Sequence, residues 1–206
     1  PSRLGELLRQ MHGLGVLEKI LPQFAHARGL LQFNEYHKYT VDEHTLRAVE
    51  QATSLERDGG VLGEAYRTLH RKWLLHLALL LHDLGKGLPE DHSEVGLRIA
   101  AETIPRLGLD PADGEVLKFL VHKHLMMSHL AFRRDTSDEQ LIVRFAVDVG
   151  SPETLQMLFV LTAYDTAAVG PGTLNAWKTD VLADLYRRTR ERLTSDAPEA
   201  AAQAAL

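Results

Sequence analysis

The sequence contains no cysteine, few aromatic residues and no long apolar run. The absence of cysteine excludes disulfides, thiolate metal sites and a cysteine nucleophile, and it fits a reducing compartment. The most apolar stretch, WLLHLALLLHDLG, holds two histidines and, at about a dozen residues, is too short to span a bilayer. No signal peptide is recognisable. We therefore expect a cytoplasmic protein that has no membrane partner.

The sequence also lacks an excess of basic over acidic residues. The chain has 23 basic and 28 acidic side chains and a net charge of −5. This balance argues against nonspecific attraction to nucleic acid or anionic membranes, so we expect no nucleic-acid partner. With 206 residues, 45% of them apolar, the chain can bury a sizeable core. Its first residue is proline rather than methionine, which suggests a piece of a longer protein.

Apolar residues recur at spacings of three and four, and no stretch alternates for long enough to be a strand. This pattern predicts an all-α bundle. A T-x-x-E capping box at Thr40 and Glu43 is expected to start one helix. We predict one domain over residues 1–195, an extended loop over 25–39, and a linker or disordered tail over 196–206. The predicted helices cover residues 3–12, 40–57, 62–82, 91–104, 111–125, 137–149, 152–168 and 173–194.

An imidazole and a carboxylate, His82 and Asp83, stand side by side at the end of the leucine-rich stretch. Burying a charge costs several kcal/mol unless a partner or a metal meets it. Helical phase places four further polar residues on inward faces of other predicted helices. Together the six are His44, His82, Asp83, His92, His124 and Asp165.

Each of these residues alone has an ordinary explanation, because a single inward histidine is more often a hydrogen-bonded core residue than a ligand. Six in one domain are better explained by a shared metal centre. Histidine and carboxylate ligands without thiolate suit Mn, Fe, Mg, Co or Zn. The set is large enough for one or two divalent ions, with Asp83 as the natural bridge.

The spacing of His44, the His82–Asp83 pair and Asp165 resembles that of the HD superfamily of metal-dependent phosphohydrolases. Longer motifs, over about residues 1–188, resemble the central HD domain of the bifunctional uridylyltransferase/uridylyl-removing enzymes of bacterial nitrogen regulation. These motifs are YHKYTVDEHTLRAVE, HDLGKG, DHSEVG, HLMMS, RRD, LTAYD and NAWKTDVLADLY.

The resemblance implies a helical HD-domain bundle that hydrolyses the uridylyl group from a tyrosine of the PII signal protein. Uridylylated PII is then the expected partner and substrate. Manganese is the first choice of ion, and nucleotidyltransferase and ACT domains are expected in the full-length chain.

Roles for single residues follow from this implied reaction. We expect Asp83 to hold the attacking hydroxide. Lys86, with Arg133 and Arg134, is expected to bind substrate and offset the phosphoryl charge, because cationic donors stabilise phosphoryl oxygens. Ser128 is a further candidate phosphate contact.

Some positions depart from the family pattern. Phe132 stands where a glutamine is expected, Leu174 where the family often has tryptophan, and Tyr164 is bulkier than usual beside Asp165. We expect these changes to affect substrate shape rather than metal binding.

The remaining histidines are not assigned to the site. His76 is predicted to pack in the central helix, and His122 and His129 are set aside by helical phase or by departure from the family pattern. Four are predicted to be surface or loop residues: His12, His26, His37 and His70.

Two other functions stay open. One is an HD phosphohydrolase that acts on free nucleotides, for which the metal chemistry would be the same. The other is a catalytically silent helical module that relays glutamine status, which predicts an incomplete ligand set.

Overall fold

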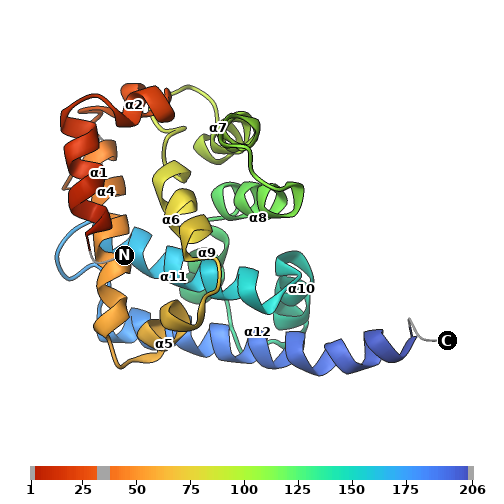
Figure 1. Ribbon diagram of the computed structural model, residues 1–206. Coiled ribbons are helices and arrows are strands. Elements are labelled where there is room, and N and C mark those ends of the chain that lie inside the picture. The colour runs from red at the N-terminus through yellow and green to blue at the C-terminus, as the bar shows by residue number, and fades with distance from the viewer. Residues whose placement is uncertain (1–2, 32–37, 204–206) are drawn as a thin grey trace.

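The computed structural model describes residues 3–31 and 38–203, and helices account for all of their regular secondary structure (Figure 1). The predicted all-α bundle is confirmed. The predicted loop over 25–39 falls partly, and His37 wholly, outside the described residues, and its first residues, 25–27, are helical instead. The helices are α1 (Leu4–Gly13), α2 (Leu17–Ile20), α3 (Phe24–Ala27), α4 (Val41–Ser54), α5 (Val61–Thr68), α6 (Lys72–Leu81), α7 (His92–Leu107), α8 (Pro111–His122), α9 (Met126–Arg133), α10 (Glu139–Val149), α11 (Pro152–Ala168) and α12 (Ala176–Gln203), with a 3-10 turn at Leu55–Arg57 after α4.

Three helices, α4, α6 and α11, form the centre of the bundle. Helix α4 packs against α6 and α11, while α7 and α8 pair beside α6 and α12 runs under α11 (Figure 1). Every residue of α6 from Leu74 to Leu81 is buried, which explains why its sequence is apolar on all faces. The polar pair His82–Asp83 follows directly, so it is placed inside the bundle.

The predicted single helix over 62–82 is wrong, because the chain forms two helices, α5 and α6, with a break between them. Leu69 is extended at the break, with φ −63° and ψ 128°. Arg71, at the start of α6, binds Glu153 of α11 and Asp113 of α8. These partners are distant in sequence, so local periodicity could not reveal the break.

The predicted helix over 111–125 is also too long. Helix α8 ends at His122, and a separate helix, α9, begins at Met126. At the turn between them the ring of His124 is hydrogen-bonded to the carbonyl of Val121, with 2.6 Å between Nδ1 and the oxygen. Helix α9 was not predicted as a separate element, and it forms one wall of the cavity described below.

The predicted capping box is absent. Thr40 is the N-cap residue of α4, but its side chain makes no capping hydrogen bond, and the carboxylate of Glu43 binds Arg9 and Arg47 instead. Other helix starts are capped as their sequences suggest: Asp91, Asp110, Asp138 and Ser151 each accept a bond from a backbone N–H of the following helix.

The later helices lie close to their predicted ranges. Helix α11 matches the predicted 152–168, while α12 starts at Ala176 and continues past 194 to Gln203. Within the described part of the chain, none of the helices combines the length and hydropathy that crossing a bilayer requires.

Candidate metal centre

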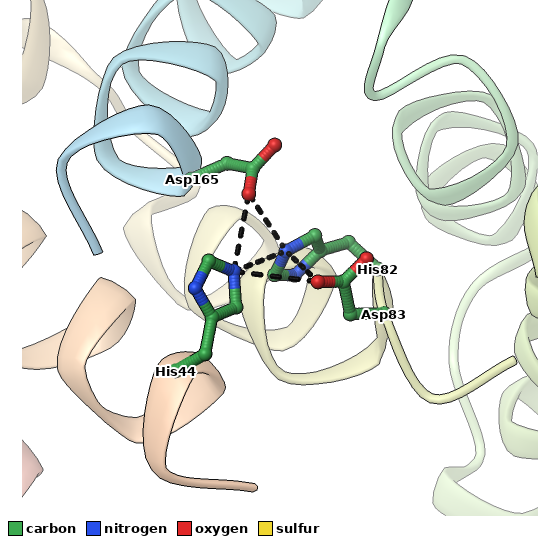
Figure 2. Close-up of side chains that lie close together, drawn as sticks. All are labelled: His44, His82, Asp83 and Asp165. Carbon is green, nitrogen blue, oxygen red and sulfur yellow. Dashed lines mark hydrogen bonds and ion pairs between the residues drawn. The ribbon is translucent and has the colours of Figure 1, made fainter. Parts of the chain in front are cut away.

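Four of the six predicted ligands meet at the centre of the bundle (Figure 2). They come from α4, from the turn after α6, and from α11. The Nε2 atom of His44 lies 3.1 Å from Oδ1 of Asp165, 3.3 Å from Oδ2 of Asp83 and 3.3 Å from Nε2 of His82. The Nε2 atom of His82 lies 3.4 Å from Oδ2 of Asp83 and 3.4 Å from Oδ1 of Asp165. One ion could contact all four residues.

The other two predicted ligands form a second group with Asp83. Nε2 of His92, on α7, and Nε2 of His124, after α8, lie 3.9 Å and 3.8 Å from Oδ1 of Asp83 and 3.3 Å from each other. Asp83 therefore directs Oδ2 at the first group and Oδ1 at the second. This is the arrangement that a carboxylate needs to bridge two ions.

Backbone contacts orient two of the rings. Nδ1 of His82 lies 2.8 Å from the carbonyl oxygen of Leu79, and Nδ1 of His124 bonds that of Val121 in the same way. A carbonyl accepts only, so each Nδ1 carries a hydrogen, and in the neutral form of each ring the lone pair is on Nε2, which faces the group. Such second contacts are typical of metal-binding histidines.

The site is buried, and its charges perturb one another. Burial alone would raise the pKa of Asp83, but the positive charges of His82 and Lys86 outweigh it and hold that pKa well below its usual range. Burial would lower the pKa of His82, but the carboxylates of Asp83 and Asp165 raise it to about 10. Burial, reinforced by the charge of His82, lowers the pKa of His124 to about 4. Both acids are thus held ionised, as ligands must be.

The donor set fits a divalent ion. Each group offers one nitrogen or oxygen atom per residue, and within a group these atoms lie within 4.8 Å of one another. Imidazole and carboxylate donors without sulfur are the ligands of Mn, Fe, Mg, Co and Zn sites. His44, His82, Asp83 and His124 are almost completely buried, so a cation held there would offset their desolvated charge and polarity.

A cavity of about 720 Å³ opens onto these ligands, and Asp83, His92 and Asp165 form part of its lining. Its volume is in the range of small-molecule sites. One wall is a single face of α9 and the residue before it, with positions spaced as i, i+3, i+4, i+7 and i+8: Leu125, Ser128, His129, Phe132 and Arg133.

The structure brings most of the other predicted site residues to this cavity. Lys86, Ser128 and Arg133 line it, and the ammonium of Lys86 lies 2.7 Å from Oδ2 of Asp83. Arg134 does not line this cavity, because it faces a separate surface hollow with Asp135 and Asp138.

Sequence reasoning missed several residues that line the cavity, among them His129, Phe132 as a wall residue, and Lys178. The helical spacing from Leu125 to Arg133 was the signal that would have found the first two, had α9 been recognised.

One histidine lies differently from prediction, and a second has an unexpected contact. His12 is not a surface residue: its ring is half-buried between Glu18 and Asp42, at 2.9 Å and 3.0 Å. His26 is exposed as expected, but its Nε2 lies 3.1 Å from the carbonyl oxygen of Lys86, next to the site.

Three further histidines lie as predicted. His70 is exposed. His76 is buried and bonds the hydroxyl of Tyr66. His122 points away from the cavity and pairs with Glu94.

A family model described as "HD domain" matches residues 41–146 of this chain, which include five of the six clustered residues. The chain belongs to the HD domain family. Asp165 lies beyond the matched residues, but the fold of this HD domain returns it to the same ligand group through α11.

Two proteins with similar sequences carry the same enzyme name. The chain is 43% identical, over 90% of its length, to a bifunctional uridylyltransferase/uridylyl-removing enzyme of Ruegeria pomeroyi. It is 42% identical, over 91%, to the protein of the same name from Nitrobacter winogradskyi. In each case the chain covers 21% of the relative, so it spans about a fifth of their length.

Proposed function

We propose that this HD domain is a metal-dependent phosphodiesterase that removes UMP from a uridylylated tyrosine of the PII signal protein. The observation that carries the proposal is the pair of ligand groups that share Asp83 at one end of a cavity of about 720 Å³. The names of the two relatives, which include uridylyl-removing activity, support this choice of substrate.

We assign the two groups to one or two divalent ions, with manganese as the first choice among metals that accept nitrogen and oxygen ligands. Bound ions would supply Lewis-acid activation of water and of the phosphoryl group, which is the larger part of the catalysis expected. Asp83, held ionised and shared between the groups, would fix the position of the reacting water relative to phosphorus.

The cations of the cavity would act on the phosphodiester itself. Lys86 stands beside Asp83 and faces the cavity, where its ammonium would offset charge on the phosphoryl oxygens. Arg133 lines the same cavity and can bind a second oxygen, and Ser128 is a further candidate contact. Arg134 is withdrawn from this role because it faces another hollow. The leaving tyrosine phenolate has an ordinary pKa of about 10 and needs only modest protonation.

The same two relatives support our proposals for the location, the companion domains and the partner of this domain. We propose a cytoplasmic enzyme in which nucleotidyltransferase and ACT domains accompany this domain in the full-length chain. Uridylylated PII would be its partner, with no nucleic acid and no membrane involved.

Release of UMP from uridylylated PII in the presence of Mn²⁺ tests the proposal directly. The isosteric change Asp83→Asn should lower the rate by at least about 100-fold, because it removes the shared carboxylate charge. Asp148→Asn, an exposed change outside the cavity lining, is the matched control and should leave the rate unchanged.

A panel of free nucleotides, run in parallel, separates the alternative substrate class. Faster turnover of a free nucleotide than of uridylylated PII would favour the general nucleotide phosphohydrolase. Full activity of Asp83→Asn toward uridylylated PII would refute the proposed site.

A further inference from the structure

The cavity face of α9 leads away from the metal centre. It begins at Leu125, which directly follows His124, and continues through Ser128 and His129 to Phe132. A helix rises 1.5 Å per residue, so Phe132 lies about 10 Å along the axis from Leu125. The cavity therefore has a phosphoryl end at Asp83 and Lys86, and a second end beside Phe132.

This second end has a definite chemistry. The ring of Phe132 lies 6.0 Å from that of Trp177, at an interplanar angle of 32°. The ammonium of Lys178, on α12, lies 5.7 Å from the Phe132 ring centre and also lines the cavity. An aromatic ring and a cationic donor thus stand together on one wall.

The wall is fixed to the same helix that carries the metal ligand Asp165. Lys178 donates a hydrogen bond of 2.8 Å to the carbonyl of Thr173. The hydroxyl of Thr173 donates in turn to the carbonyl of Thr166, which directly follows Asp165 on α11. The cation at the far end is therefore positioned relative to the reacting end by short, local contacts.

A flat ring beside a hydrogen-bond donor matches a nucleobase. Bases pack their faces on aromatic side chains, and a lysine ammonium can donate to a base carbonyl oxygen while it keeps a backbone contact, because it has three hydrogens. The phenol ring of the substrate tyrosine could also pack on Phe132, but it carries no carbonyl oxygen for Lys178. The nucleoside side of the phosphodiester, which carries the base, can contact both the Phe132 ring and the Lys178 ammonium.

We propose that Phe132 and Lys178 form a base subsite that binds the uracil of the nucleotidyl group while its phosphate lies at the metal centre. The choice of uracil rests on the proposed function. The Phe132 side chain supplies the packing surface, and Lys178 supplies the donor that selects a base carrying a carbonyl oxygen.

Binding of the product UMP tests this subsite without any catalytic turnover. The chain has two tryptophans, Trp73 and Trp177, and Trp73 lies on another surface hollow. In a Trp73→Phe background, with Mg²⁺ present, UMP should change the fluorescence of Trp177, whereas ribose 5-phosphate should not. Calorimetry gives the affinities of UMP, AMP, ribose 5-phosphate and phenyl phosphate for the same protein.

Substitutions then distinguish binding of the base from binding of the phosphate. Phe132→Leu should weaken UMP about 10-fold and leave ribose 5-phosphate unchanged, since stacking on one aromatic ring accounts for a loss of that order. Lys178→Met should also weaken UMP, reduce its preference over AMP, and be partly rescued by Lys178→Arg. Phe119→Leu and Lys118→Met, at positions outside the cavity lining, are the matched controls and should bind UMP as the parent does.

The subsite would be overturned by absent UMP binding, by unchanged Trp177 fluorescence, or by equal weakening of UMP and ribose 5-phosphate in Phe132→Leu. Selective loss of phenyl phosphate affinity would also overturn it, because this result assigns Phe132 to the tyrosine side. Failure to release UMP from PII, with these binding results as expected, would count against the proposed function and leave the subsite in place.

Discussion

Asp83 shows how a single residue can be costly to bury and still be required. It is 1% exposed, yet its two oxygens face different pairs of imidazoles, and Lys86 lies 2.7 Å from one of them. An unpaired carboxylate in this position would be strongly destabilising. The residue is stable there because charges from several helices surround it, and these same charges keep it ionised.

The pH dependence of the free energy of unfolding should reflect the titration of His76, a buried histidine outside the metal centre. Burial lowers its pKa to about 4 in the folded chain, while its unfolded value is near 6.5. Between these values the unfolded state binds the extra proton, so His76 lowers stability as the pH falls from 6.5 toward 4, by roughly 2–3 kcal/mol in all. Urea unfolding at pH 7, 6 and 5 should give a shallower decline for His76→Gln, which cannot titrate.

The exposed His70→Gln is the control for this measurement and should follow the parent curve. Identical pH profiles for His76→Gln and the parent would contradict the assignment.

Individual helices meet at the site only because small residues let them approach. Gly85 lies in the turn after α6, and a Cβ there would lie 2.3 Å from the carbonyl oxygen of His92 and 2.8 Å from Cβ of Val95. At Gly96 of α7, an added Cβ would lie 3.0 Å from Cγ1 of Val121 on α8. These contacts set how closely α7 approaches the turn that carries Asp83 and helix α8.

Gly85→Ala should therefore disturb both the packing of α7 and the second ligand group. We expect a loss of about 1–3 kcal/mol in the free energy of unfolding, as for overpacked core positions, together with weaker binding of Mn²⁺. Denaturant unfolding and Mn²⁺ titration calorimetry measure the two effects. Gly59→Ala is the matched control, because a Cβ at Gly59 meets nothing within 4 Å. Equal behaviour of the two variants would refute this account of Gly85.

At the scale of the whole molecule, the ligands tie together segments that are far apart in the chain. His44 comes from α4 and Asp165 from α11, while the remaining four lie in or beside α6, α7 and α8. Divalent ions in the two groups would together link all of these elements. Because the assembled site exists only in the folded chain, binding adds directly to the stability of the fold.

Addition of Mn²⁺ at about 100 times its dissociation constant should stabilise the domain by about 2.7 kcal/mol. For a chain of this size, this raises Tm by about 5–10 °C. EDTA should reverse the shift, and Asp83→Asn should abolish it, whereas Asp148→Asn should keep it. Thermal unfolding followed by circular dichroism measures the effect. An equal shift in Asp83→Asn would show that the ion binds elsewhere.

The sequence by itself determined which helix face is occupied by each candidate ligand that lies on a helix. The 3.6-residue period is a local property, so it placed His44, His92 and Asp165 on inward faces and set the limits of α11 correctly. The continuous apolar run of α6 likewise indicated a central helix.

Only the tertiary structure decided how these faces meet. The break at Leu69 depends on partners of Arg71 in α8 and α11, and the separate start of α9 gave the cavity its wall. The same long-range packing directs Arg134 away from the cavity and brings Lys178 into it. Local periodicity fixes the direction of a side chain relative to its own helix, whereas its neighbours are fixed by contacts between segments that are distant in the chain.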